Sequence, residues 1–445
     1  MSNSEQPGTA PEKGPSADVP AGSPTPLVSR RGLLGAAGVG VVGAGVGLAA
    51  GLSVGGHEST VASATPAVPS YPFYGDHQAG IATPAQDRLH FATFDLISSS
   101  RADLVGLLQD WTAAAARMTQ GRDAGPFGAV AGPYDAPPDD TGEALDLPPS
   151  GLTLTFGFGP SLFRLAGRDR FGLANQQPAA LQRLPHFPGD QLDEARSDGD
   201  LCVQACADDP QVAVHAVRNL ARIAMGRAAL RWSQLGFGRT SSTSTSQATP
   251  RNLFGFKDGT MNLKAEQPEL LDQHVWVPAG DGRDSWLTGG SYLVARRINM
   301  RIETWDRQPL REQERVVGRT KAQGAPLSGG EEFTQPNFSL ARADGEPLVP
   351  AEAHVRLAHP DQNQGVQMLR RGYNFVDGNN RLGQLDAGLF FIAYVRDPRT
   401  HYIPMQSRLA RHDGMSEYLQ HTGSGLFAVP PGVQPGGFLG QTLLG

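Results

Sequence analysis

Hydrophobic and polar residues follow two kinds of pattern along the first half of the chain. Apolar, β-branched or alternating runs at 88–96, 151–159 and 200–209 predict β-strands. In the segment 100–118, apolar residues recur at three- and four-residue steps, which predicts a helix. The segment 209–232 opens with Asp-Pro and has the same spacing, so it predicts a long amphipathic helix.

The second half follows a Ser/Thr-rich link at 239–252 and repeats the mixture. The pattern predicts a strand over 290–307, a helix over 311–321 and a strand over 389–397. Strands and helices do not alternate regularly, as they would in a parallel α/β sheet. The order therefore favours an α+β fold, with an antiparallel sheet covered by helices in each half.

The N-terminal 65 residues differ from the rest in composition. A polar, Pro-rich stretch is followed by the pair Arg30 and Arg31 and then by a weakly apolar, Gly-rich run. This pattern indicates a disordered start and a twin-arginine (Tat) export signal, with a retained membrane anchor as the alternative. The GxGxxG match at 38–43 lies inside this run, without the preceding strand that a dinucleotide site needs, and we interpret it as accidental. We expect domains at 66–240 and 241–445.

Composition and charge exclude several classes of function. The formal net charge is −6, and the Lys and Arg residues are scattered, so no basic face for nucleic acid is expected. The two cysteines, Cys202 and Cys206, lie on one face of a predicted strand but too far apart for a disulfide, and we expect buried thiols. No CxxCH, HExxH or P-loop motif occurs.

Three kinds of side chain stand out in apolar or Gly-rich surroundings. Asp258 lies in "NLFGFKDGT", Arg370 and Arg371 in "MLRRGYNF", and His354 and His359 in "AEAHVRLAHP". A spacing of five residues prevents the two histidines from binding one ion together in either a strand or a helix. One histidine ligand, a carboxylate and a guanidinium are what a haem peroxidase requires.

Each of these residues also has an ordinary structural interpretation. Asp258 could form the turn that its Gly-Thr neighbours suggest, the arginines could belong to salt bridges, and His354 could be a core histidine. Residue patterns alone leave these alternatives open.

A series of longer motifs resembles the dye-decolorizing peroxidases, in particular their Tat-exported branch. The motifs occur in the same order as in that family over residues 71–430: "FYGDHQAGIATP", "DLCVQACADD", "GFKDGT", "GSYLVARRI", "AHVRLAHP", "LRRGYNF" and "DAGLFFIAYVRD". The resemblance implies two ferredoxin-like α+β domains of the dimeric α+β barrel type, with haem b (iron protoporphyrin IX) in the second.

The resemblance also assigns residues to roles. It places Gly255, Asp258 and Gly259 on the GxxDG motif and so puts Asp258 on the distal side of the haem. It implies His354 as the proximal iron ligand and leaves His359 structural. The distal arginine falls on Arg370.

Further assignments follow from what a haem site needs. Because neighbours in an extended segment face opposite ways, we expect Arg371 to point away from the peroxide site. Propionates need cations, for which Arg356 and Arg296 or Arg297 are candidates. We expect Asp386 to accept the Nδ1 proton of the ligand histidine. Phe375 is expected either to cover the distal pocket or to belong to the core.

The function implied is oxidation of dyes, phenols or other organic or metal-complex reductants by hydrogen peroxide through a ferryl intermediate. The alternative implied by the same branch is an exported haem-handling protein, a deferrochelatase that releases iron from haem. The Tat translocase would be a partner, and the protein would be extracellular or attached to the cell envelope. The sequence leaves the oligomeric state open.

Overall fold

The computed structural model describes residues 70–280 and 282–445. The predicted export signal at Arg30 and Arg31 lies outside the described residues. Within the part of the chain that is described, no helix is long and apolar enough to span a membrane.

Among the described residues, nine strands form one antiparallel sheet in the order β5-β9-β2-β3-β1-β4-β7-β8-β6. A further pairing of β5 with β8 closes the sheet on itself. The strands are β1 (Arg88–Leu96), β2 (Thr153–Phe158), β3 (Leu201–Ala207), β4 (Ala228–Arg239), β5 (Ser291–Met300), β6 (Leu369–Arg370), β7 (Tyr373–Asn379), β8 (Leu385–Val395) and β9 (Leu419–Val429). Strands β1–β4 of the first half join those of the second half through the β4–β7 and β2–β9 pairings.

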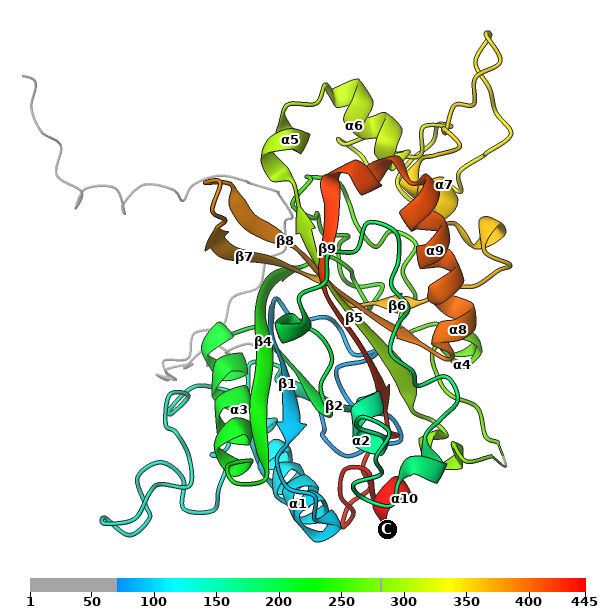
Figure 1. The fold of residues 1–445 in the computed structure, drawn as a ribbon. Coiled ribbons are helices and arrows are strands. Elements are labelled where there is room, and N and C mark those ends of the chain that lie inside the picture. The colour runs from blue at the N-terminus through cyan, green and yellow to red at the C-terminus, as the bar shows by residue number, and fades with distance from the viewer. Residues whose placement is uncertain (1–69, 281) are drawn as a thin grey trace, which may run out of the picture. The chain divides into compact units, whose positions relative to one another are not determined.

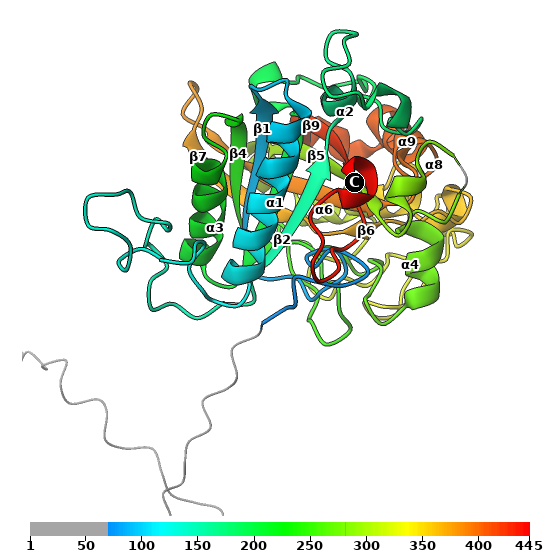
Figure 2. The same ribbon diagram turned by 90° about the horizontal axis from the view of Figure 1, so that it is seen from below.

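Helices cover the outside of this sheet in two groups. Helices α1 and α3 lie side by side against β1 and β4, while α7, α8 and α9 lie over the strands of the second half (Figures 1 and 2). The helices are α1 (Arg101–Met118), α2 (Pro160–Phe163), α3 (Pro210–Ile223), α4 (Pro268–His274), α5 (Ile302–Asp306), α6 (Leu310–Val317), α7 (His354–Leu357), α8 (Pro398–His401), α9 (Ile403–His412) and α10 (Gln441–Leu444). The α+β class and the antiparallel strands that the sequence predicts are confirmed.

Alternation along each strand gives the closed sheet two apolar faces. In β1, Phe91 points into a cluster with Phe390 and Trp232, whereas Phe94 points the other way and packs against Trp111 of α1. Cys202 and Cys206 are free thiols buried in the inner cluster, as expected. Burying both faces in this way fixes the register, since a one-residue slip would reverse every side chain.

Two predicted elements have different ends from those expected. The helix predicted over 209–232 ends at Ile223, and β4 begins at Ala228. Between them Gly226 has a φ of +81°, a left-handed conformation that ends the helix and reverses the chain. The strand predicted over 290–307 ends at Met300, because the chain turns there into α5.

Candidate functional site

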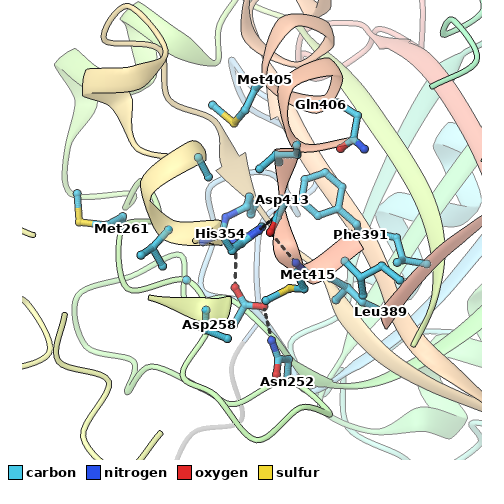
Figure 3. Close-up of a pocket in the computed structure, with 18 of the residues that line it drawn as sticks. Asn252, Asp258, Met261, His354, Leu389, Phe391, Met405, Gln406, Asp413 and Met415 are labelled. Carbon is cyan, nitrogen blue, oxygen red and sulfur yellow. Dashed lines mark hydrogen bonds and ion pairs between the residues drawn. The ribbon is translucent and has the colours of Figure 1, made fainter. Parts of the chain in front are cut away.

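A cavity of about 300 Å³ lies between the outer face of the sheet and helices α7 and α9 (Figure 3). Alternate residues of β8, β5 and β9 form one wall: Leu389, Phe391, Ile298, Met300, Leu419 and His421. The helices contribute His354, Val355, Met405, Gln406, Leu409 and Ala410 to the opposite side. The size and mainly apolar lining, with a few polar groups, are typical of a site for an organic cofactor or ligand.

His354 begins α7 and lines the cavity, and one of its ring nitrogens is hydrogen-bonded within the protein. Its Nδ1 lies 2.6 Å from Oδ2 of Asp413, whose side chain is only 3% exposed. The other carboxylate oxygen of Asp413 accepts the backbone N–H of Met415 at 2.9 Å, which fixes the carboxylate. An Nδ1–H bond of this kind leaves the Nε2 lone pair free to bind a metal.

The charge on Asp413 also affects the protonation of His354. Burial disfavours the charged imidazolium, but the Asp413 carboxylate outweighs burial and raises the pKa of His354 above its usual value. The carboxylate therefore makes the imidazole more basic, which strengthens it as a ligand.

Asp258 is held in a tight loop before Gly259. The backbone N–H of Asp258 donates to the carbonyl of Pro250 at 2.9 Å. Gly259 has a φ of +84°, and a Cβ atom there would lie 2.9 Å from the backbone Cα of Ser241. Glycine is therefore required next to Asp258 both for conformation and for space.

Arg370 reaches Asp258 from β6. Its Nη1 lies 2.8 Å from Oδ1 of Asp258, and Oδ2 of Asp258 accepts a bond from Asn252 at 3.2 Å. Asn262 holds the backbone of Arg370 on both sides, with Oδ1 accepting the Arg370 N–H at 2.7 Å and Nδ2 donating to its carbonyl at 2.9 Å. The carboxylate and guanidinium are thus positioned by their backbones before any ligand binds.

The cavity therefore holds two polar pairs among apolar walls. The first pair, His354 with Asp413, offers a free imidazole nitrogen, and the second, Asp258 with Arg370, offers a proton acceptor and a fixed cation. A single imidazole donor and broad apolar walls fit haem, which binds its axial ligand on one face and needs an acid–base group and a cation on the other. The arrangement fits the cofactor that the sequence resemblance predicts.

The remaining residues of the same two motifs lie as expected. His359 also lines the cavity and is buried; its Nδ1 accepts the Asp361 N–H at 3.2 Å and its Nε2 lies 3.4 Å from Gln335. Both of its ring nitrogens thus have protein neighbours, which agrees with a structural role. Arg371 points away from the cavity, is fully buried and donates to the carbonyl of Thr83 and to Gln86.

Several of the predicted site residues do not line the cavity. Asp386 accepts bonds from Arg297 at 2.9 Å and Asn299 at 2.7 Å, so the prediction that it orients the ligand histidine is wrong. Asp413 takes that position because the chain returns to His354 after α9. Gly255 is also absent from the cavity wall, whereas Gly259 lines it.

The predicted cations need the same correction, and Phe375 takes the core position that was the alternative to the distal pocket. Arg296 is fully buried in an ion pair with Asp190, and Arg356 donates to the Val349 carbonyl at 2.9 Å. Phe375 faces the inner cluster, where the Arg297 guanidinium lies 4.1 Å from its ring centre. The alternation along β7 explains the position of Phe375, since a side chain that points into the closed sheet cannot also reach the cavity on its outer face.

The structure brings in residues that sequence reasoning missed. Leu389 and Phe391 of β8 are aliphatic and aromatic residues of the cavity wall, where Phe375 was a candidate. Arg319 contributes a second guanidinium to the wall, in addition to Arg370, and is buried. His421 also lines the wall, and burial together with Arg296 lowers its pKa to about 3, so it is neutral. The alternation of "LFFIAYV" could have placed Leu389 and Phe391 together on one face of the strand, opposite Phe390.

The chain matches known proteins over most of its length. Residues 78–238 match the family model described as Dyp-type peroxidase, N-terminal, and residues 249–434 match Dyp-type peroxidase, C-terminal. Among curated proteins, the chain is 38% identical over 378 residues to a deferrochelatase of Yersinia pseudotuberculosis serotype I (strain IP32953), covering 84% of each chain. It is equally similar to a deferrochelatase of Escherichia coli O6:K15:H31 (strain 536 / UPEC), covering 87% of that protein.

Solved structures show the same likeness. The DyP-type peroxidase of Streptomyces coelicolor is 41% identical, with a TM-score of 0.77 over 86% of this chain and 100% of that chain. Ferric DtpA from Streptomyces lividans gives the same identity, TM-score and coverage. A DyP-type peroxidase of Cellulomonas bogoriensis is 39% identical with a TM-score of 0.75, over 86% of this chain and 99% of that chain.

Proposed function

Because the chain belongs to the Dyp-type peroxidase family, we propose that it is a haem b peroxidase that uses hydrogen peroxide to oxidise dyes, phenols or other organic or metal-complex reductants. The observation that carries this proposal is the pairing inside one cavity of His354 with Asp413 and of Asp258 with Arg370. A protein that only carried haem would need the first pair but not the second.

Three residues would hold the cofactor. His354 would bind the iron through Nε2, while the Asp413 carboxylate fixes the tautomer and orientation of the ring. Arg319, on the cavity wall with its Nη1 already bonded to the Gly324 carbonyl at 2.7 Å, would supply positive charge to a propionate.

Two residues would act on the peroxide. Haem supplies the electrons that cleavage of the O–O bond requires. Asp258 accepts the proton of one peroxide oxygen and returns it to the other, a role typically worth about 10²–10⁴-fold in rate. Arg370 stabilises the negative charge of the departing oxygen, which is worth about 10²–10³-fold for a fixed donor. We propose that Arg370 contributes more, since a water can shuttle a proton but cannot replace a fixed charge.

Stopped-flow spectroscopy of the Soret band after mixing with peroxide tests these roles. Asp258→Ala and Arg370→Leu, each shown to bind haem, should both slow the spectral change by more than about tenfold, with Arg370→Leu slower. Arg381→Leu is the matched control, because Arg381 is exposed on the β7–β8 hairpin. If neither distal variant is slower than this control, the assignment fails; if Asp258→Ala is the slower of the two, only the ranking fails.

The curated relatives named deferrochelatase support a second candidate function, release of iron from haem with the porphyrin left intact. The two functions give different products. Incubation with haem and a reductant, without peroxide, should leave no fluorescent metal-free porphyrin if the protein is a peroxidase. Accumulation of metal-free porphyrin at the rate of haem loss would favour the chelatase function instead.

We also propose Tat export to the cell envelope or the exterior, supported by Arg30 and Arg31 before the weakly apolar run. Changing both arginines to lysine should retain folded, haem-loaded protein in the cytoplasm. Equal amounts of exported protein from the variant and the wild type would contradict this localisation.

A further inference from the structure

Methionine residues gather at the cavity. The chain has eight methionines, and seven of them lie within the described residues. Five of those seven line the cavity: Met261, Met300, Met368, Met405 and Met415. The two others are elsewhere, since Met118 ends α1 and is 2% exposed, and Met225 follows α3 and is 75% exposed.

The five methionines come from separate parts of the chain. Met300 ends β5, Met405 lies in α9, and Met415 lies in the turn after α9. Met261 and Met368 belong to the segments that carry Asp258 and Arg370. In Figure 3 the labelled Met261, Met405 and Met415 lie on different sides of His354. Their convergence is therefore a property of the fold and not of one Met-rich stretch.

A thioether differs from the other apolar side chains chiefly because its sulfur can be oxidised. Leucine would fill the same space with a similar volume, but only methionine can take up an oxygen atom reversibly, as the sulfoxide. Packing alone would therefore not require sulfur at these positions, although methionine also fills irregular apolar gaps well. The two explanations differ in what they predict under peroxide.

Met261 is the most exposed of the five methionines on the cavity wall. It is 36% exposed, three residues beyond Asp258, and its Sδ lies 3.9 Å from Nε2 of Gln335. Met300, Met405 and Met415 are each less than 9% exposed. Met261 is thus the cavity thioether with the greatest access from solvent, and it lies three residues from Asp258 of the proposed peroxide site.

We propose that Met261 is a modification site, at which the thioether is oxidised to the sulfoxide by hydrogen peroxide held in this cavity when no reductant is present, and that the other cavity methionines follow. The inference rests on the proposed peroxidase function. In the step, the O–O bond of peroxide breaks and one oxygen forms the S–O bond, so sulfur loses two electrons. The second oxygen leaves as water with both protons of the peroxide, and no further reactant is needed.

The modification changes the cavity itself. A sulfoxide is polar and chiral where the thioether was apolar, and it places an unpaired acceptor among apolar neighbours. Oxidation at Met300, Met405 or Met415 should therefore loosen the cofactor, whereas oxidation at Met261, which is part-exposed, can be solvated. Met261 would then act as the first acceptor, protecting the three buried methionines behind it.

Peptide mass spectrometry after timed exposure of the haem-loaded protein to peroxide tests the proposal, because it reads out oxygen added to each methionine and not turnover. Met225 is the control for direct attack from solution, since it is twice as exposed as Met261. Met118 is the control for burial, since it is as buried as Met300. We expect Met261 to gain oxygen at least about tenfold faster than Met225, because proximity to the bound peroxide outweighs exposure, and Met118 to remain unmodified.

Three comparisons make the result decisive. A saturating reducing dye should suppress oxidation of Met261 while leaving the slow oxidation of Met225 unchanged. Met261→Leu should move the first added oxygen to another cavity methionine, whereas Met225→Leu should not change the order in the cavity. Oxidation in the order of exposure, with Met225 first, would overturn the inference. If the dye is oxidised normally in that case, the peroxidase function stands; if the dye is not oxidised at all, the proposed function fails as well.

Discussion

Replacing Asp413 by asparagine tests the part of the site that the structure adds to the sequence. The asparagine oxygen can still accept the Met415 N–H, which keeps the turn after α9. The atom that faces His354 Nδ1 becomes an amide donor in place of a carboxylate oxygen. The ring then either loses its acceptor or moves its proton to Nε2, where it blocks the metal.

The size of the effect follows from the geometry of this contact. The Nδ1–Oδ2 distance is 2.6 Å and the Asp413 side chain is 3% exposed, so solvent screens the bond very little. Hydrogen bonds to charged groups contribute about 1.5–3 kcal/mol, which corresponds to a factor of about 10–150 in affinity. Loss of such an outer partner typically weakens a metal site by about 10–100-fold. We expect Asp413→Asn to weaken haem binding by a factor in that range.

The assay is the rate of haem transfer to an excess of a haem-scavenging protein, followed at the Soret band. Asp386→Asn is the matched control, since it makes the same chemical change to a carboxylate that contacts Arg297 and Asn299 and not His354. The control should lose haem at the wild-type rate. Faster loss from Asp386→Asn than from Asp413→Asn would refute the reasoning and restore the assignment made from the sequence.

Three other predictions follow from single contacts. Asn262→Ala removes both bonds to the Arg370 backbone. The Soret change with peroxide should therefore slow by about tenfold or more, while the affinity for haem stays the same. An unchanged rate would mean that Arg370 is held without Asn262. Gly259→Ala should slow the same reaction, because its Cβ would meet the Ser241 backbone, whereas Gly378→Ala, also at positive φ but with open space around it, should lower only the melting temperature. Burial opposes ionisation of Asp140, but bonds from His215, Ala124 and Gly142 outweigh it and lower its pKa to about 2. The ionised Asp140 carboxylate therefore stabilises the fold by about 2 kcal/mol above pH ~4, and this contribution is lost as pH falls toward 2. The difference in melting temperature between wild type and Asp140→Asn should shrink over that interval. A constant difference would contradict the lowered pKa of Asp140.

The sequence predicted those parts of the site that depend on short contiguous motifs. Asp258 precedes a glycine that the backbone demands, and Arg370 and Arg371 alternate along an extended segment, so their opposite directions could be inferred. His354 could be separated from His359 only through the family resemblance, because the residue pattern alone left both open.

The parts that failed depend on contacts between distant segments. Asp413 lies 59 residues after His354, and no local spacing relates it to that histidine. Asp386 is closer in sequence, but its Oδ1 accepts bonds from Arg297 and Asn299 of β5, the strand that pairs with its own. Phe375 and Phe391 are both aromatic residues in strands, and only the closure of the sheet decides which one faces the cavity.

Closure of the sheet has a consequence for how this molecule reaches its native state. The strands of each half find their partners in the other half at two seams, β4 with β7 and β2 with β9. At one of these seams the buried Arg371 donates to backbone oxygens near Thr83, almost 290 residues away in the chain. A fragment containing only the second half would expose two unpaired strand edges and leave Arg371 without its partners near Thr83, so it should aggregate. We therefore expect the cofactor pocket to reach its final form late in folding, after the two halves have paired, because contacts of such long sequence separation form slowly.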